Sequence, residues 1–143
     1  MASGDWIDAT GTQYTAAAGA ANGKVFWFAG SGSHVYRKYV MNDGATAAEN
    51  GVYQHVGGAD YVKLDVQLNG DTATVRIWEQ STIDGQLPAA TSEIHQVGSN
   101  MSADASVTVT EVSEFMKSEV SAHSAGTGGV QVIMEAHYLN GRP

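Results

Sequence analysis

The dipeptide Asn69-Gly70 stands between two runs of alternating apolar and polar residues, at residues 61–68 and 71–80. Asn-Gly is the strongest short signal for a tight β-turn, because both residues accept the positive φ that such a turn requires. A hairpin at this turn would give three apolar pairs: Val62–Ile77, Leu64–Val75 and Val66–Ala73. A shift of one residue would break every pair. The segment therefore predicts an antiparallel sheet with one buried and one solvated face.

The composition favours strands along the whole chain. Its 143 residues include 15 Val and 5 Ile but only 4 Leu, and 17 Gly against 2 Pro. β-Branched residues suit pleated surfaces, and glycine supplies the turns between strands. Short strands joined by glycine turns are typical of sandwiches and small barrels. We expect an all-β fold, either a single antiparallel, jelly-roll-like β-sandwich or a small barrel, with 7–9 short strands.

Two parts of the chain are predicted. Residues 1–23 read as an N-terminal extended arm in which Trp6, Ile7 and Tyr14 are isolated apolar anchors, and residues 24–143 form a single β domain. Residues 112–120 fit two patterns, a helix or a strand with a bulge near Glu114. We favour the strand because both flanking segments have β patterns.

The charge pattern bears on partners and location. The net charge is −8, and most of the excess acid lies after residue 58. An acidic chain without a basic stripe repels phosphate backbones, so we expect no nucleic-acid partner and no binding to anionic membranes. The chain has no cysteine, which excludes disulfides and thiolate metal sites. Its first residues lack a signal-peptide pattern, so we expect synthesis in the cytoplasm without a signal peptide.

Chemistry-bearing residues do not form a recognisable motif. The five histidines lack metal-site spacing, although His123 and His137 could face each other across a hairpin near Glu135. Three carboxylates, Glu111, Glu114 and Glu119, are close in sequence only, which is typical of a solvated face. We therefore predict no enzyme activity, no catalytic residues, no cofactor and no metal.

The aromatic residues give two readings of a contact surface. Tyr36, Tyr53, Tyr61 and Trp78 could form an exposed strip on which a sugar stacks. Aromatic residues are also enriched in protein interfaces. The predicted contact residues combine the arm, the first strand and the outer face of the hairpin: Trp6, Ile7, Tyr14, Trp27, Tyr61, Lys63, Arg76 and Trp78.

These observations favour a structural protein that acts by assembly. Small, nearly neutral side chains dominate the sequence, since only 15% of residues are charged. We expect a homo-oligomer whose arm docks on a neighbouring protein, with bacteriophage virion components such as capsid decoration (cement) or tail proteins as the leading class. Its partners would be further copies and a capsid or tail protein, and its location the virion. A carbohydrate-binding β-sandwich module is the alternative.

Overall fold

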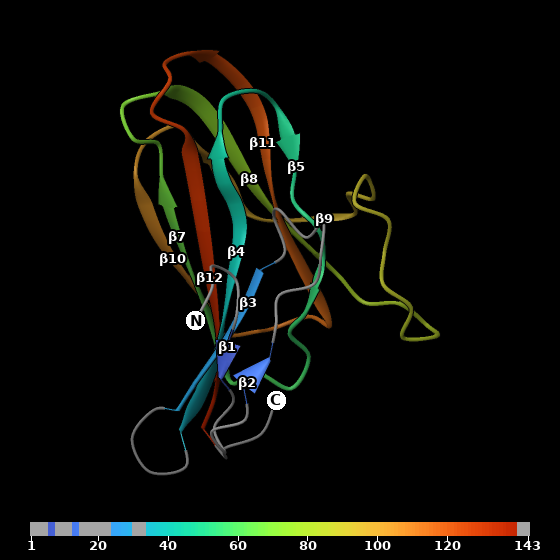
Figure 1. Cartoon of the computed structure of the whole chain (residues 1–143). Coiled ribbons are helices and arrows are strands. Elements are labelled where there is room, and N and C mark those ends of the chain that lie inside the picture. The colour runs from blue at the N-terminus through green and yellow to red at the C-terminus, as the bar shows by residue number, and fades with distance from the viewer. Residues whose placement is uncertain (1–5, 8–12, 15–23, 30–33, 140–143) are drawn as a thin grey trace.

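The structure, a computed structural model, describes residues 6–7, 13–14, 24–29 and 34–139. Every regular element in these ranges is a β-strand, and none is a helix. The strands within residues 24–29 and 34–139 build two antiparallel sheets that face each other (Figure 1), which confirms the predicted all-β, sandwich-like class. Eight described strands have five or more residues, within the predicted range. No pairing among the described strands joins the two sheets into a barrel.

Sheet I has the strand order β10-β7-β12-β4-β3. In that order its strands are Ala105–Val109, Tyr61–Gln67, Val130–Tyr138, Val35–Ala45 and Lys24–Ala29. Strand β12 lies in the middle, as its largely apolar sequence predicts. Along β7 the alternation of burial is complete, because Leu64 is fully buried while its neighbours Lys63 and Asp65 are exposed.

Sheet II has the order β5-β11-β8-β9, and β6 pairs with β11 as well. These strands are Glu49–Asn50, Phe115–Ala125, Thr72–Gln80, His95–Met101 and, for β6, Gln54–His55. Strand β11 confirms the strand interpretation for residues 115–120, whereas residues 112–114 precede the strand. Its register shifts lie between Val120 and Ala122 and between His123 and Ala125, not near Glu114.

The core lies between the two sheets. Sheet I contributes Tyr39, Leu64 and Met134 to it, and sheet II contributes Val75 and Ile77 from β8. All of these side chains are at most 1% exposed. Burial of this apolar surface is the main favourable term in the stability of such a fold.

The turn at Asn69-Gly70 forms, but the predicted hairpin is wrong. The two residues have φ values of 52° and 85°, and Asp71 N donates to Leu68 O at 3.0 Å. However, β7 belongs to sheet I and β8 to sheet II. The apolar face predicted for both strands is buried as expected.

The partners of β7 and β8 therefore differ from the predicted ones. Leu64 lies opposite Met134 and Val107, and Val75 lies opposite Val120. Alternation determines which face of a strand is buried, and the turn determines that the chain reverses. Neither determines whether two strands bond edge to edge or stack face to face across a core.

Four connections cross between the sheets at one end of the sandwich, which we call the crossover end. They are β4–β5, β7–β8, β9–β10 and β11–β12. Leu68 N donates to Asp104 Oδ1 at 2.8 Å, and Asn69 Nδ2 donates to Gly129 O at 2.7 Å. These bonds tie the β7–β8 turn to two other crossings, and the arches gather at the upper end in Figure 1.

The carboxylate of Asp71 is the centre of the crossover end. It accepts hydrogen bonds from Gly128 N at 2.7 Å, from Gly129 N at 3.0 Å and from His123 Nε2 at 2.8 Å. The side chain is only 1% exposed. The hydrogen bond from His123, helped by the two backbone N–H groups, holds the pKa of Asp71 below its ordinary value, although burial acts in the opposite direction.

The predicted N-terminal arm falls mostly outside the described residues, at 1–5, 8–12 and 15–23. Its described parts are β1 (Trp6–Ile7) and β2 (Gln13–Tyr14), which pair with each other. Strand β1 lies against β3.

We expect the Asp71→Asn variant to lose stability at neutral pH, because the neutral amide replaces a carboxylate that accepts three hydrogen bonds. A lowered folded-state pKa means that the ionised group stabilises the fold above its ordinary pKa of 3.8. This stabilisation is lost as the pH falls from 3.8 through the lower pKa of Asp71 in the folded state. Urea unfolding at a series of pH values should therefore show a weaker acid dependence in the variant. An equal effect of the exposed-site control Asp84→Asn would contradict this role.

Two glycine variants test the packing at the crossover end. A Cβ at Gly128 would lie 2.0 Å from the carbonyl oxygen of Asn69, whereas a Cβ at Gly70 meets no atom within 4 Å. Gly70→Ala should cost about 1–2 kcal/mol through its positive φ alone. We expect Gly128→Ala to cost more, because backbone atoms must move apart. Unfolding free energies that rank the two variants in the opposite order would refute the close approach.

Candidate functional site

The predicted contact residues do not form one surface. Tyr61 and Lys63 lie on the outer face of sheet I, whereas Arg76 and Trp78 lie on the outer face of sheet II. Lys63 lies opposite Glu135, and Arg76 lies opposite Glu119. Because β7 and β8 stack face to face in different sheets, Tyr61 and Lys63 are separated from Arg76 and Trp78.

The other predicted contact residues are placed only by their backbone. Trp6 and Ile7 lie on β1, Tyr14 on β2, and Trp27 on β3 opposite Arg37. Their side chains lie outside the described residues. A contact role for these four side chains therefore stays a prediction.

The predicted aromatic strip is not assembled either. Tyr61 stacks on His137 with ring centroids 4.4 Å apart, and Tyr36 stacks on the same imidazole at 5.0 Å. Tyr53 is only 1% exposed, and Trp78 belongs to the other sheet, where its Nε1 donates to Glu119. One face of each stacked tyrosine is thus covered by His137, and the four aromatic residues do not share a surface.

His137 is the centre of a polar network on the outer face of sheet I. His34 Nε2 lies 2.8 Å from His137 Nδ1, and His137 Nε2 lies 3.0 Å from Glu135 Oε1. Burial lowers the pKa of His137, and the neighbouring Glu135 only partly offsets this effect. The predicted contact of His123 with His137 is wrong, because His123 lies on β11 and binds Asp71.

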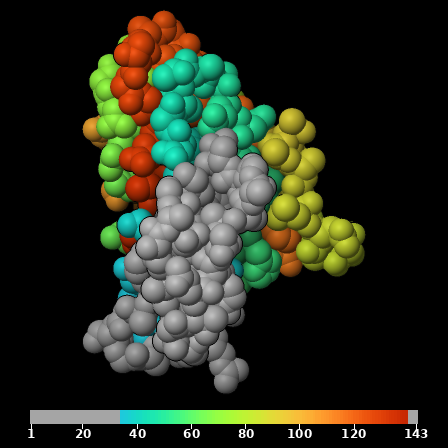
Figure 2. All heavy atoms as spheres, viewed as in Figure 1, coloured from blue at the N-terminus to red at the C-terminus, as the bar shows by residue number. Residues whose placement is uncertain are grey.

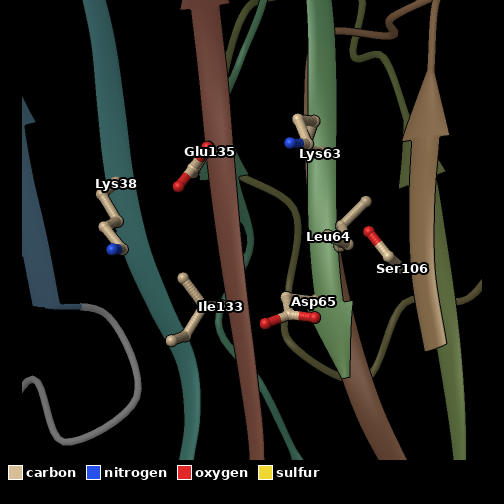
Figure 3. Close-up of a pocket in the computed structure, with 7 residues that line it drawn as sticks. All are labelled: Lys38, Lys63, Leu64, Asp65, Ser106, Ile133 and Glu135. Carbon is tan, nitrogen blue, oxygen red and sulfur yellow. The ribbon is translucent and has the colours of Figure 1, made fainter. Parts of the chain in front are cut away.

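A shallow hollow of about 270 Å³ lies beside this network on sheet I. Figure 3 shows charged side chains of both signs around it, with Lys63 and Asp65 on β7 and Glu135 on β12. The remaining lining residues are Lys38, Leu64, Ser106 and Ile133. Glu135 lies opposite Lys63 on one neighbouring strand and Lys38 on the other, so charges of opposite sign face each other across the strands, as is common on a solvated face.

The most unusual surface of the described chain is the loop of residues 81–94 between β8 and β9. Figures 1 and 2 show it in yellow, standing out from the body of the sandwich. Ile83 is fully exposed, Ile94 is 72% exposed and Leu87 is 57% exposed. Only two other large apolar side chains, Val52 and Leu139, are exposed in the described residues. Val52 is next in sequence to Tyr53, whose hydroxyl donates a hydrogen bond to Ser92 of this loop.

A fully buried lysine anchors the base of this loop. Lys117 Nζ donates to Ala90 O, to Asn50 Oδ1 at 3.1 Å and to Glu93 Oε1 at 3.3 Å. Its ammonium group also lies 5.6 Å from the centre of the Tyr53 ring. A buried cation needs such partners, because desolvation of an unpaired charge is very costly. Lys117 therefore holds residues 90–93 against sheet II.

Further hydrogen bonds hold both ends of the loop. Thr82 donates from its N and its Oγ1 to Glu114 Oε1, at 3.1 Å and 3.2 Å. Tyr53 OH donates to Ser92 O at 2.6 Å, and Ser92 Oγ donates to Gln80 Oε1 at 2.8 Å. Burial, followed by the nearby Glu93, raises the pKa of Tyr53 to about 12, so its hydroxyl stays protonated as the donor. The base of the loop is thus ordered while its apolar tip is exposed.

This arrangement has the properties of a docking element. A partner that covers exposed apolar side chains lowers the free energy, and an anchored loop loses less conformational entropy on binding than a free one. The sequence pattern indicates only an irregular connection at residues 81–92, containing Pro88, followed by a short strand at residues 93–97; the observed strand β9 begins at His95. Three large aliphatic residues in a turn-like segment were the available signal, but their exposure follows from the position of the loop in the folded chain.

Two of the three candidate carboxylates, Glu114 and Glu119, have structural partners. Glu114 binds Thr82, and Glu119 accepts from Trp78. Among the described residues no group of three or more His, Asp or Glu is placed to hold a metal ion. In that same part of the chain, no helix is long and apolar enough to span a bilayer.

Comparisons with protein-family models, curated protein sequences and solved structures gave no match.

We expect Lys117→Met to release the loop while the sandwich stays folded. The variant removes three hydrogen bonds at the loop base, and each is worth about 0.5–1.5 kcal/mol net. Amide hydrogen exchange in residues 81–94 should become at least about tenfold faster. Lys63→Met, at an exposed lysine on sheet I, is the matched control. Unchanged exchange in the loop of the Lys117→Met variant would show that the anchor is unimportant.

Proposed function

We propose that the protein is a non-enzymatic structural protein that acts by docking on another protein through loop 81–94. The observation that carries this proposal is the combination of an ordered base with an exposed apolar tip at Ile83 and Leu87. The free energy falls when a partner removes exposed aliphatic side chains from water. An anchored loop presents them in one arrangement.

Charge indicates the kind of partner. Asp84 lies between the two apolar residues of the tip, and the chain as a whole carries a net charge of −8. A complementary partner would offer an apolar groove with a neutral or basic rim. The negative charge disfavours an anionic membrane surface, so a protein groove fits the loop better than a bilayer.

A virion component is the class that we propose within this function. A rigid β-sandwich with a small-residue, weakly charged sequence and a projecting loop suits a bacteriophage capsid decoration (cement) or tail protein. Such a protein needs a stable body and a surface that binds a repeating neighbour. The predicted docking arm, with Trp6, Ile7 and Tyr14, would add a second contact to that neighbour.

The test uses capsids and tails of the phage that encodes the chain, prepared without this protein. We expect the purified protein to cosediment with one of them at a fixed stoichiometry. The variant I83S/L87S should bind at least about tenfold more weakly, because a buried apolar anchor is typically worth more than 1 kcal/mol. Both side chains are exposed, so the thermal midpoint should hardly change.

Leu139→Ser is the matched control, since Leu139 is an exposed aliphatic residue at the end of β12, away from the loop. It should bind like the unmodified protein. Equal binding of I83S/L87S and the unmodified protein would remove the loop from the contact. Failure of the unmodified protein to bind either particle would overturn the virion assignment.

A further inference from the structure

Strand β10 is an edge of sheet I with one bonded neighbour among the described strands. It pairs with β7 over five consecutive residues without a register shift, from Ala105 opposite Val66 to Val109 opposite Val62. The sequence of the strand is ASVTV, which contains no charged residue and no proline. An edge of this kind presents a row of backbone N–H and C=O groups that can bond to another strand.

The other described edges carry the protection that β10 lacks. Strand β9 has a register shift between its partners Val75 and Ile77, and Gly98 there has a φ of 68°. Strands β5 and β6 have two residues each, and β3 lies against β1. Bulges, short strands and covering segments are the usual ways in which proteins block edge pairing.

We propose that β10 pairs antiparallel with β10 of a second copy of this chain, with the twofold axis at Val107. In this register opposed residue numbers sum to 214, so Ser106 lies opposite Thr108 of the other copy, and Ala105 lies opposite Val109. Two copies of sheet I would then form one continuous sheet. A contact in which the same strand serves both partners is the isologous arrangement of twofold dimers.

The side chains of β10 match this register on both faces. Ser106 and Thr108 are exposed on the outer face, where small hydroxyl side chains pair well across strands. On the inner face Val107 packs against the core but stays partly exposed. Pairing would bring the Val107 side chains of the two copies together at the axis and cover the apolar row from Ala105 to Val109.

Charges next to the strand do not oppose the pairing. Asp104 would lie opposite Thr110 of the other copy, and Glu111 opposite Ala103, so like charges do not face each other. Asp104 Oδ1 already accepts a hydrogen bond from Leu68 N, which holds it at the crossover end. A second copy is therefore a better occupant than an unrelated strand, because the strand is complementary to itself.

This inference is independent of the proposed docking role. The edge belongs to sheet I, whereas loop 81–94 follows β8 of sheet II. A dimer through β10 would leave both copies of the loop exposed and would make docking bivalent, which raises the apparent affinity for a repeating surface.

Sedimentation velocity across a concentration series tests the dimer. We expect the unmodified chain to show a reversible monomer–dimer equilibrium. The variants S106K/T108K and S106E/T108E each place two pairs of like charges across the axis, so each should dimerise about tenfold more weakly at low ionic strength. An equimolar mixture of the two variants should form heterodimers, because the same positions then carry opposite charges.

The control variant S124K/T127K makes the same residue changes at exposed positions of the β11–β12 region and should leave the dimer intact. The docking variant I83S/L87S should also dimerise normally, which separates this test from that of the proposed function. A monomer at every concentration would overturn the proposal. So would a dimer that S106K/T108K does not weaken, or variant mixtures that fail to form heterodimers.

Discussion

The buried carboxylate of Asp71 is the interaction on which the rest of the sandwich depends. It joins the turn after β7 to the connection between β11 and β12 through two backbone N–H groups and His123. Because β7 and β12 belong to sheet I and β8 and β11 to sheet II, this single group holds both sheets in register at one end. Ionised and shielded from water, it accepts more hydrogen bonds than a neutral side chain of its size could.

A second buried charge, Lys117, holds the base of the projecting loop 81–94. Lys117 projects from β11 away from the core, and the chain covers it with residues 90–93. The cost of burying an ammonium group is offset only if the covering segment stays in place. The apolar tip of the loop is therefore held out in solvent on an ordered base, on the side of the molecule opposite to sheet I.

Residues 61–80 show what the sequence predicted correctly and what it did not. The alternation in residues 61–68 and 71–80 correctly predicted which side chains of each strand are buried, and Asn69-Gly70 correctly predicted the turn. The partner strands were wrong, since Leu64 lies opposite Met134 rather than Val75. For the same reason Tyr61 and Trp78, which were combined in one predicted contact set, lie on different sheets. The exposure of Ile83 was not predicted, because it is a property of the folded surface.

The sequence by itself determined the all-β class, the positions and inward faces of β7 and β8, and the sharp reversal at residue 69. These properties follow from local periodicity and from backbone preferences, which a short segment carries alone. Only the tertiary structure decided which strands share a sheet, where Asp71 and Lys117 find their partners and which apolar residues stay in solvent. Those outcomes depend on contacts between residues far apart in the chain, such as Asp71 with Gly128, and no local pattern encodes them.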